Sequence, residues 1–328
     1  MLKTTDIDYT APAKLIPIQI PKPWGQEIWY SGIESRGESC VEIANTRIPL
    51  SDYLSGIGLP EVLLLKVLDP SPVSVVGDLY FEVHEKKREV YVVTHIDPIA
   101  WPDGKGQIRF GMNQEHRSAY ENDDDFRVAY LQAVRAYEGV RRSIDETKDT
   151  QQDGPRSQLI EKEQIARKEM DNYTAIESLA VGDVVSVPTW TPHALQHGVR
   201  VVEFQTPVYE RLIVSFAQKV LTQGHWDTKQ AVERMTMEAP TTPVFEPVSD
   251  GVERIARFDD FNVWRIDRLN PHPVELPRDL PYAVVMNLSG SLNIKDLQLG
   301  PEEAALVPVS ALHHPIQGQR FLIAAPGL

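Results

Sequence analysis

The chain has 328 residues, of which 42% are hydrophobic, and a formal net charge of −14 at pH 7. This length permits two domains with sizeable cores, whereas the acidic charge argues against a nucleic-acid or membrane-surface partner. Cys40 is the only cysteine, which excludes an intramolecular disulfide and a cysteine-based zinc site, and a free thiol predicts a cytoplasmic location.

The N-terminal part of the chain predicts short strands. The 25 prolines and 19 glycines suit many short strands separated by turns better than a few long helices. Apolar and β-branched runs bounded by turn residues predict strands at 61–68, 73–76, 79–84 and 89–95. No run approaches the ~20 apolar residues that a membrane span needs.

The middle of the chain predicts a helical insertion over residues 105–175. Apolar side chains recur at helical spacing between 122 and 146, and Asn122 followed by three aspartates suits a helix N-terminus. A second, more charged helix is predicted over 157–170, after the helix-breaking residues 153–155.

Strand patterns return after the insertion. They predict strands at 184–187, 199–204, 263–266 and 282–288, and one more helix within 225–240. The proline-containing stretch that ends this helix predicts a domain boundary, so the C-terminal residues are expected to form a second all-β unit.

Two segments carry residues suited to metal binding. In the first, Glu82 and His84 are two residues apart, so on a strand they lie on the same face. Glu89 begins the next predicted strand, and a hairpin would bring it beside them. The second segment, 182–193, consists of a glycine, five residues, a proline and four residues, and it ends at His193.

These segments resemble the two motifs of the cupin family, with Glu82 in place of the first histidine. The resemblance implies that Glu82, His84, Glu89 and His193 bind one divalent metal. Two carboxylates and two imidazoles suit zinc first, with manganese, iron or nickel as alternatives. Trp190 stands in the second motif where a glycine is common.

A narrower resemblance, to the type I phosphomannose isomerases, covers most of the chain in the order of the family. The matching stretches are Lys22-Pro23-Trp24-Gly25 with Glu27 and Trp29, Leu64 to Asp69, Glu82-Val83-His84, Lys87-Arg88-Glu89, Pro188 to Leu195, Glu203 to Thr206, and Tyr209-Glu210-Arg211.

The resemblance implies a mainly β fold of two cupin (jelly-roll) β-barrels with a helical insertion. The implied domains are a metal-binding cupin from residues 1–104 and 176–224, the helical insertion 105–175, and a linker helix with a second, metal-free cupin over 225–328.

The resemblance also implies an enzyme, a metal-dependent isomerase that interconverts mannose 6-phosphate and fructose 6-phosphate or acts on a related sugar. The expected partner is thus a small (phospho)sugar. In such a reaction Arg211 would stabilise charge on the intermediate and Lys87 would orient a hydroxyl. Lys66 would meet a phosphate or carboxylate of the substrate, with a strand lysine that simply points to solvent as the alternative, and Tyr80 would face the substrate. The base that moves the proton stays open, with Glu82 as one candidate and Glu210 as a weaker one.

Several positions depart from the family pattern. Glu82 replaces a glutamine, Tyr80 replaces a serine that helps to hold the substrate phosphate, and Pro207 stands where an acidic residue is expected. These departures leave a second hypothesis open: a metal-binding cupin without this activity, which binds a sugar or another ligand or acts on another substrate.

A different alignment of the first motif is also possible. It matches 72–74 to a family Pro-Leu-Ser and puts Val76 and Asp78 at the ligand positions. The cupin spacing to Glu89 favours Glu82 and His84 instead.

Overall fold

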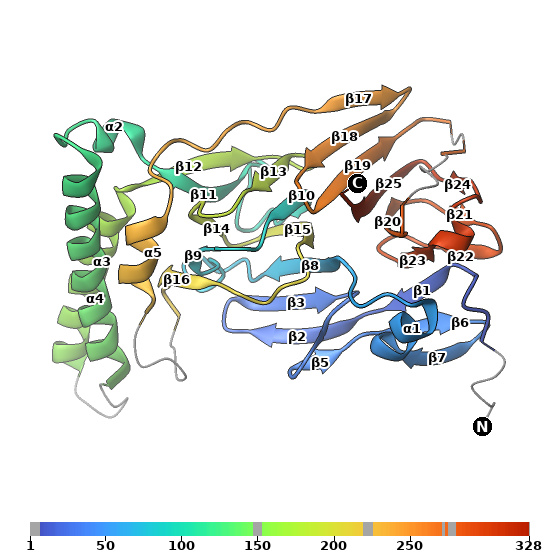
Figure 1. Ribbon diagram of the computed structural model, residues 1–328. Coiled ribbons are helices and arrows are strands. Elements are labelled where there is room, and N and C mark those ends of the chain that lie inside the picture. Colours follow the sequence, from blue (N-terminus) through green and yellow to red (C-terminus); the bar gives the residue numbers. More distant parts are fainter. Residues whose placement is uncertain (1–6, 147–152, 219–225, 271–272, 275–279, 328) are drawn as a thin grey trace.

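The structure is a computed structural model that describes residues 7–146, 153–218, 226–270, 273–274 and 280–327 (Figure 1). The predicted domain boundary between residues 224 and 225 lies outside these described residues. The described chain forms packed β-sheets with a group of helices at one end (Figure 1). None of its helices is both long and apolar enough to cross a membrane.

Most strands belong to three antiparallel sheets, named A, B and C here. Sheet A has the order β17 (Glu246–Ser249), β18 (Val252–Arg257), β19 (Phe261–Asp267), β25 (Arg320–Pro326), β20 (Tyr282–Ser289), β23 (Ala304–Pro308), β1 (Ala13–Ile16), β6 (Cys40–Ile43) and β7 (Thr46–Pro49). Sheet B has the order β13 (Val184–Val187), β10 (Glu89–Ile96), β15 (Val199–Gln205), β8 (Leu64–Pro70), β3 (Gly25–Trp29) and β2 (Ile18–Lys22). Sheet C has the order β12 (Thr174–Leu179), β11 (Gly106–Met112), β14 (His193–Leu195), β9 (Phe81–Val83) and β16 (Leu212–Ser215).

The remaining elements are small sheets and helices. Sheet D has the order β22 (Leu297–Leu299), β21 (Leu292–Ile294) and β24 (Ile316–Gln317), and β4 (Ile33–Glu34) pairs with β5 (Gly37–Glu38) in a separate hairpin. The helices are α1 (Leu50–Ile57), α2 (Gln114–Arg117), α3 (Asp123–Glu146), α4 (Asp153–Asp171), α5 (Thr228–Arg234) and the 3₁₀ turn η2 (Val309–Ala311).

The sheets are stacked in layers, because successive side chains of a strand point to opposite faces and each face packs against a different neighbour. On β10, Val90 and Val92 pack with residues of sheet A, whereas Tyr91 and Val93 pack with residues of sheet C. The other face of sheet C packs on the helices, and the other face of sheet A packs on sheet D. The layers therefore lie in the order sheet D, sheet A, sheet B, sheet C and helices. Alternate residues of a strand contribute to the cores on its two sides.

The helical segment lies between two paired strands. The predicted helix at 122–146 is confirmed as α3, and the one at 157–170 lies within α4. The apolar stripe of α3 is buried against sheet C, through Phe126, Tyr130, Val134 and Tyr137. Strands β11 and β12 flank these helices in sequence and pair with each other, so the start of the segment expected to be helical is a strand.

One predicted strand is wrong. Residues 73–76 form bends and turns, with Val75 at a positive φ of 71°. The side chains of Val73 and Val76 are 56% and 49% exposed, so the apolar run is not buried. Two prolines precede it and a glycine follows, and those residues interrupt strand pairing.

The N-terminal residues contribute to two sheets. β1 pairs with β23 of the C-terminal half, through Leu15 opposite Ala304, and β6 pairs with β1. β2 and β3 lie at the edge of sheet B. Pairing between these distant segments ties the two halves of the described chain together (Figure 1).

Candidate metal centre

Three potential ligands meet where two short strands of sheet C lie side by side. Glu82 on β9 is directly opposite His193 on β14, and His84 follows the end of β9. One ligand atom from each of the three lies within 4.8 Å of the others. The strand alternation that buries Phe81 and Val83 against the helices turns Glu82 toward sheet B.

Both imidazole rings are oriented as metal ligands usually are. Nδ1 of His84 lies 3.0 Å from the backbone oxygen of Glu210, and Nδ1 of His193 lies 2.9 Å from that of Thr191. A proton on each Nδ1 would donate to these carbonyls and leave the Nε2 lone pair free to bind a metal. Nε2 of His84 and Oε2 of Glu82 are buried and have no hydrogen-bond partner among the described residues. Such orphaned atoms fit an ion.

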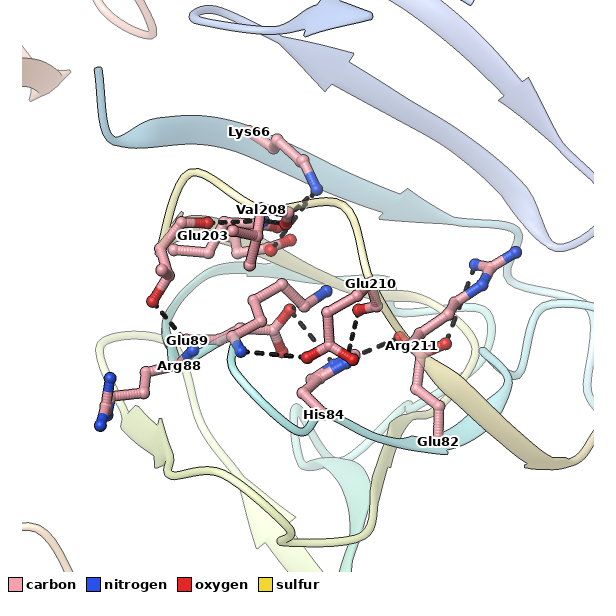
Figure 2. A network of polar contacts seen from close by, with 12 residues as sticks. Lys66, Glu82, His84, Arg88, Glu89, Glu203, Val208, Glu210 and Arg211 are labelled. Carbon is pink, nitrogen blue, oxygen red and sulfur yellow. Dashed lines mark hydrogen bonds and ion pairs between the residues drawn. The ribbon is translucent and has the colours of Figure 1, made fainter. Parts of the chain in front are cut away.

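Glu89 reaches the same place from sheet B. It is the first residue of β10 and is 2% exposed. Its Oε2 lies 3.0 Å from Nε2 of His193, and its Oε1 lies 3.5 Å from Nε2 of His84. Figure 2 shows the Glu89 carboxylate close to His84. The structure thus brings together all four residues expected to bind the metal.

Two neighbours fix the Glu89 carboxylate. The Lys87 ammonium donates to Oε1 at 2.6 Å, and the Tyr91 hydroxyl donates to Oε2 at 2.6 Å. Burial by itself would raise the pKa of Glu89, but the charges of Lys87 and His84 lower it well below its usual value. The carboxylate therefore stays ionised, as a metal ligand must.

A strained loop holds the His193 segment against the His84 segment. The Trp190 N–H donates to the backbone oxygen of His84 at 2.7 Å, and the Trp190 carbonyl accepts from Thr236 at 2.8 Å. Trp190 has φ of 62°, a left-handed conformation that favours glycine. Its ring packs under the Arg234 guanidinium, 4.1 Å from the ring centroid.

A cavity of about 240 Å³ opens beside Glu82 and Glu89. Lys66, Tyr80, Lys87 and Arg211, the residues expected to act on the substrate, all line it. Nη1 of Arg211 lies 3.8 Å from Oε2 of Glu82, and its guanidinium lies 5.0 Å from the centroid of the Tyr80 ring. Figure 2 shows Arg211 beside Glu82.

Glu210 also lines the cavity, but its carboxylate has a structural role. Oε1 accepts hydrogen bonds from the backbone N–H groups of Lys86 at 2.7 Å and Lys87 at 3.1 Å. These bonds hold the turn between β9 and β10 (Figure 2). A carboxylate committed to two donors is a poor candidate for the base.

Glu203 was not among the candidate catalytic residues and is the most unusual carboxyl group of the cavity. It is 2% exposed, its Oε1 has no hydrogen-bond partner among the described residues, and Lys66 Nζ is 3.7 Å away. Burial raises the pKa of Glu203 to about 8; Lys66 opposes this shift and Glu89 adds to it. A charged residue inside the apolar strand 199–204 was the available sequence signal.

Lys66 is more constrained than expected. Its ammonium donates to Oε1 of Gln205 at 2.5 Å and is 7% exposed. The residue from the alternative alignment, Asp78, instead binds the ring of His197 at 2.7 Å and lines a separate cavity on the helical side of sheet C. Among the described residues, the cluster with metal-ligand geometry is the one that contains Glu82 and His84.

No family model matches this sequence, and no curated protein matches it. Solved structures do match. Mannose 6-phosphate isomerase from Bacillus subtilis superposes with a TM-score of 0.67 at 16% identity, covering 96% of this chain and 99% of its own. A mutant of phosphomannose isomerase from Salmonella typhimurium gives a TM-score of 0.67 at 16% identity, with 97% and 100% coverage. A zinc-bound mannose 6-phosphate isomerase gives the same TM-score, 0.67, at 16% identity, with 97% and 100% coverage. The chain therefore has the fold of these proteins over nearly its whole length, and the predicted mainly β fold is confirmed.

Proposed function

We propose that this protein is a metal-dependent aldose–ketose isomerase that acts on mannose 6-phosphate or a closely related sugar. The observation that carries the proposal is the convergence of Glu82, His84, Glu89 and His193 beside a cavity that also presents Arg211. The solved structures that share the fold are named as mannose 6-phosphate isomerases, one of them with zinc bound.

The four converging residues would hold one divalent metal, with zinc as the first expectation. Two imidazoles and two carboxylates match its preferred nitrogen and oxygen ligands. When bound, such a metal polarises the carbonyl and hydroxyl oxygens of an open-chain sugar and favours proton loss from the carbon between them.

The residues around the cavity would stabilise charge, bind a substrate hydroxyl and transfer the proton. Arg211 is placed to stabilise negative charge that develops on the sugar oxygens. Lys87, held by Glu89, would donate to a substrate hydroxyl. Glu203 would accept the proton from one carbon and return it to the next, since a carboxyl group with a pKa near 8 exchanges protons readily at neutral pH.

The assignment of the sheets to two barrels is also a proposal. We assign sheets B and C with their helical insertion to a metal-binding cupin barrel and sheets A and D to a second, metal-free one, in a cytoplasmic enzyme. The division at residues 1–104 with 176–224, 105–175 and 225–328 stays a prediction. Strand β1 lies within residues 1–104 but belongs to sheet A, so this N-terminal strand would form part of the second, metal-free barrel.

The alternative of a binding protein without this activity is less favoured. A pocket that only held a sugar would not need two buried ionisable groups beside the metal ligands: the Lys87 cation, and the Glu203 carboxyl group, whose Oε1 has no hydrogen-bond partner among the described residues. Such groups are costly to bury and concentrate at catalytic sites.

The proposal is tested by measuring both the metal content and the turnover of the purified protein. The protein should contain about one divalent metal ion per chain, zinc first, and it should convert mannose 6-phosphate to fructose 6-phosphate in a reaction that a chelator inhibits. His193→Ala should lose both metal and turnover, whereas His95→Ala, at an exposed position of β10, should keep them. Metal without turnover would favour the binding protein, and no metal after reconstitution would contradict the ligand assignment.

A further inference from the structure

We infer that Lys22, Arg36 and Arg211 form an anion-binding cluster in the cavity, and that Arg36 sets a preference for phosphorylated over unphosphorylated sugars. The inference rests on the proposed function and names the part of the cavity that would select the substrate. Arg36 lies outside the stretches that match the isomerase family, whereas Lys22 and Arg211 lie within them, and Arg211 borders both this cluster and the proposed metal ligand Glu82.

The three cations come from separate segments and line the same cavity. Lys22 ends β2, Arg36 lies in the turn of the β4–β5 hairpin, and Arg211 immediately precedes β16. The side chain of Lys22 is only 8% exposed. Burial lowers the pKa of Lys22, Glu27 opposes this shift, and the positive charges of Arg36 and Arg211 add to it. These charges therefore lie close enough to repel one another.

The carboxylates around the cluster are shared with other groups. Glu27 pairs with Lys22 at 2.9 Å, but its other oxygen accepts from Trp29 Nε1 at 2.6 Å. Arg211 is 3.8 Å from Glu82, beyond hydrogen-bond distance, and Glu82 is a proposed metal ligand. Glu34 accepts from Arg36, so each of the three cations has one carboxylate nearby. A phosphate would add charge-assisted hydrogen bonds to the N–H groups that these carboxylates do not use.

Arg36 is presented to the cavity by its hairpin. Its guanidinium lies 4.9 Å from the centroid of the buried Trp29 ring, and Glu34 accepts from its Nε. The hairpin is held to the chain before Arg211 by the Ile33 N–H, which donates to the Tyr209 hydroxyl at 3.0 Å. Among the described residues Glu34 is the ion-pair partner of Arg36, through Nε, which leaves the terminal amino groups for an oxyanion in the planar geometry that suits phosphate.

Lys66, which was expected to meet the phosphate, is a weaker candidate than Arg36. Its ammonium is buried and already donates to Gln205 at 2.5 Å. Phosphate recognition is therefore assigned to the hairpin side of the cavity.

The experiment compares Arg36→Gln with a matched control, Arg47→Gln. Arg47 also pairs with a glutamate of its own hairpin, Glu42, at 2.8 Å, but it lies on β7 and does not line the cavity. For each protein, kcat/KM is measured for mannose 6-phosphate and for mannose, and inorganic phosphate binding is measured by calorimetry. Arg36→Gln should lower the ratio of the two kcat/KM values by about 10- to 100-fold, the range of a charge-assisted hydrogen bond, and weaken phosphate binding. Arg47→Gln should change neither.

The results distinguish a failure of the phosphate inference from a failure of the isomerase proposal. An unchanged ratio in Arg36→Gln, or equal losses on both sugars, would overturn the inference and leave the isomerase proposal standing. If the wild-type protein turns over neither sugar, the isomerase proposal fails, and phosphate binding alone decides: weaker binding in Arg36→Gln supports the cluster, and equal binding overturns it. Thermal unfolding checks that the variant is folded, and Lys22→Gln replaces it in the same assays if it is not.

Discussion

Tyr91→Phe should weaken metal binding while leaving every proposed ligand in place. Tyr91 is two residues after Glu89 on β10, so both side chains lie on the same face of sheet B. Its hydroxyl donates to Oε2 of Glu89 at 2.6 Å, and its ring is 6.1 Å from that of His193. The residue is 3% exposed, so phenylalanine keeps the packing and removes only the donor.

The size of the effect follows from the charge on Glu89. A hydrogen bond to a charged group contributes about 1.5–3 kcal/mol, and loss of a residue that orients a metal ligand typically weakens metal binding by about 10- to 100-fold. We expect a loss within that range. Burial and the charge of Glu89 raise the pKa of Tyr91 well above its usual value, so the hydroxyl stays protonated and the loss should be constant across neutral pH.

Competition between metal-free protein and a chromophoric chelator would measure this affinity. Tyr30→Phe is the matched control, since Tyr30 is also buried and its hydroxyl donates to the backbone oxygen of Glu302 at 2.6 Å, away from the metal centre. Unchanged metal affinity in a folded Tyr91→Phe protein, or an equal loss in Tyr30→Phe, would refute the reasoning.

Three further predictions concern stability. Burial, opposed by Lys66 and aided by Glu89, raises the pKa of Glu203 from 4.5 to about 8, so its ionisation opposes folding and wild-type stability should fall as the pH rises through this range. Denaturant unfolding of metal-free Glu203→Gln should show a gain over wild type of several kcal/mol near pH 8 and little gain near pH 5; parallel pH curves would contradict this. Because Trp190 has a positive φ, the Trp190→Gly protein should be more stable than the Trp190→Ala protein by about 1 kcal/mol in thermal unfolding. The reverse order would show that the loop is not strained. Phe204→Ala, at a fully buried site between sheets A and B, should cost about 3–5 kcal/mol, and a cost below 1 kcal/mol would contradict its place in the core.

The sequence was most informative where a local pattern coincided with burial. The helical stripe at 122–146 became α3 because its apolar face covers sheet C. The apolar run at 73–76 failed because nothing buries it, and adjacent prolines and a glycine make it a turn. The pairing of β1 with β23 could not be predicted, since register between strands so far apart depends on the whole sheet.

The same division holds for the candidate site. Spacing within one strand placed Glu82 and His84 on one face, but it could not show that His193 would lie directly opposite Glu82. Glu203 was overlooked as a base because its role depends on what surrounds it: it is 2% exposed, and Glu89 lies nearby. Burial and the charges of neighbours are tertiary properties, so a carboxyl group with a raised pKa is invisible in the order of residues alone.

The position of the site follows from how sheets B and C meet. On β10, Glu89 and Tyr91 face sheet C at the polar end of the interface, and Val93 on the same face belongs to an apolar core. The candidate metal centre is therefore closed by packed side chains on one side and open to the cavity on the other. Lys87 and Glu89 line the cavity but are only 7% and 2% exposed, so burial strengthens their interaction, and the open side admits a small substrate. A sugar that enters the cavity would meet the cluster of Lys22, Arg36 and Arg211 in the same cavity as the metal ligands, so charge selection and carbonyl chemistry would occur in one pocket.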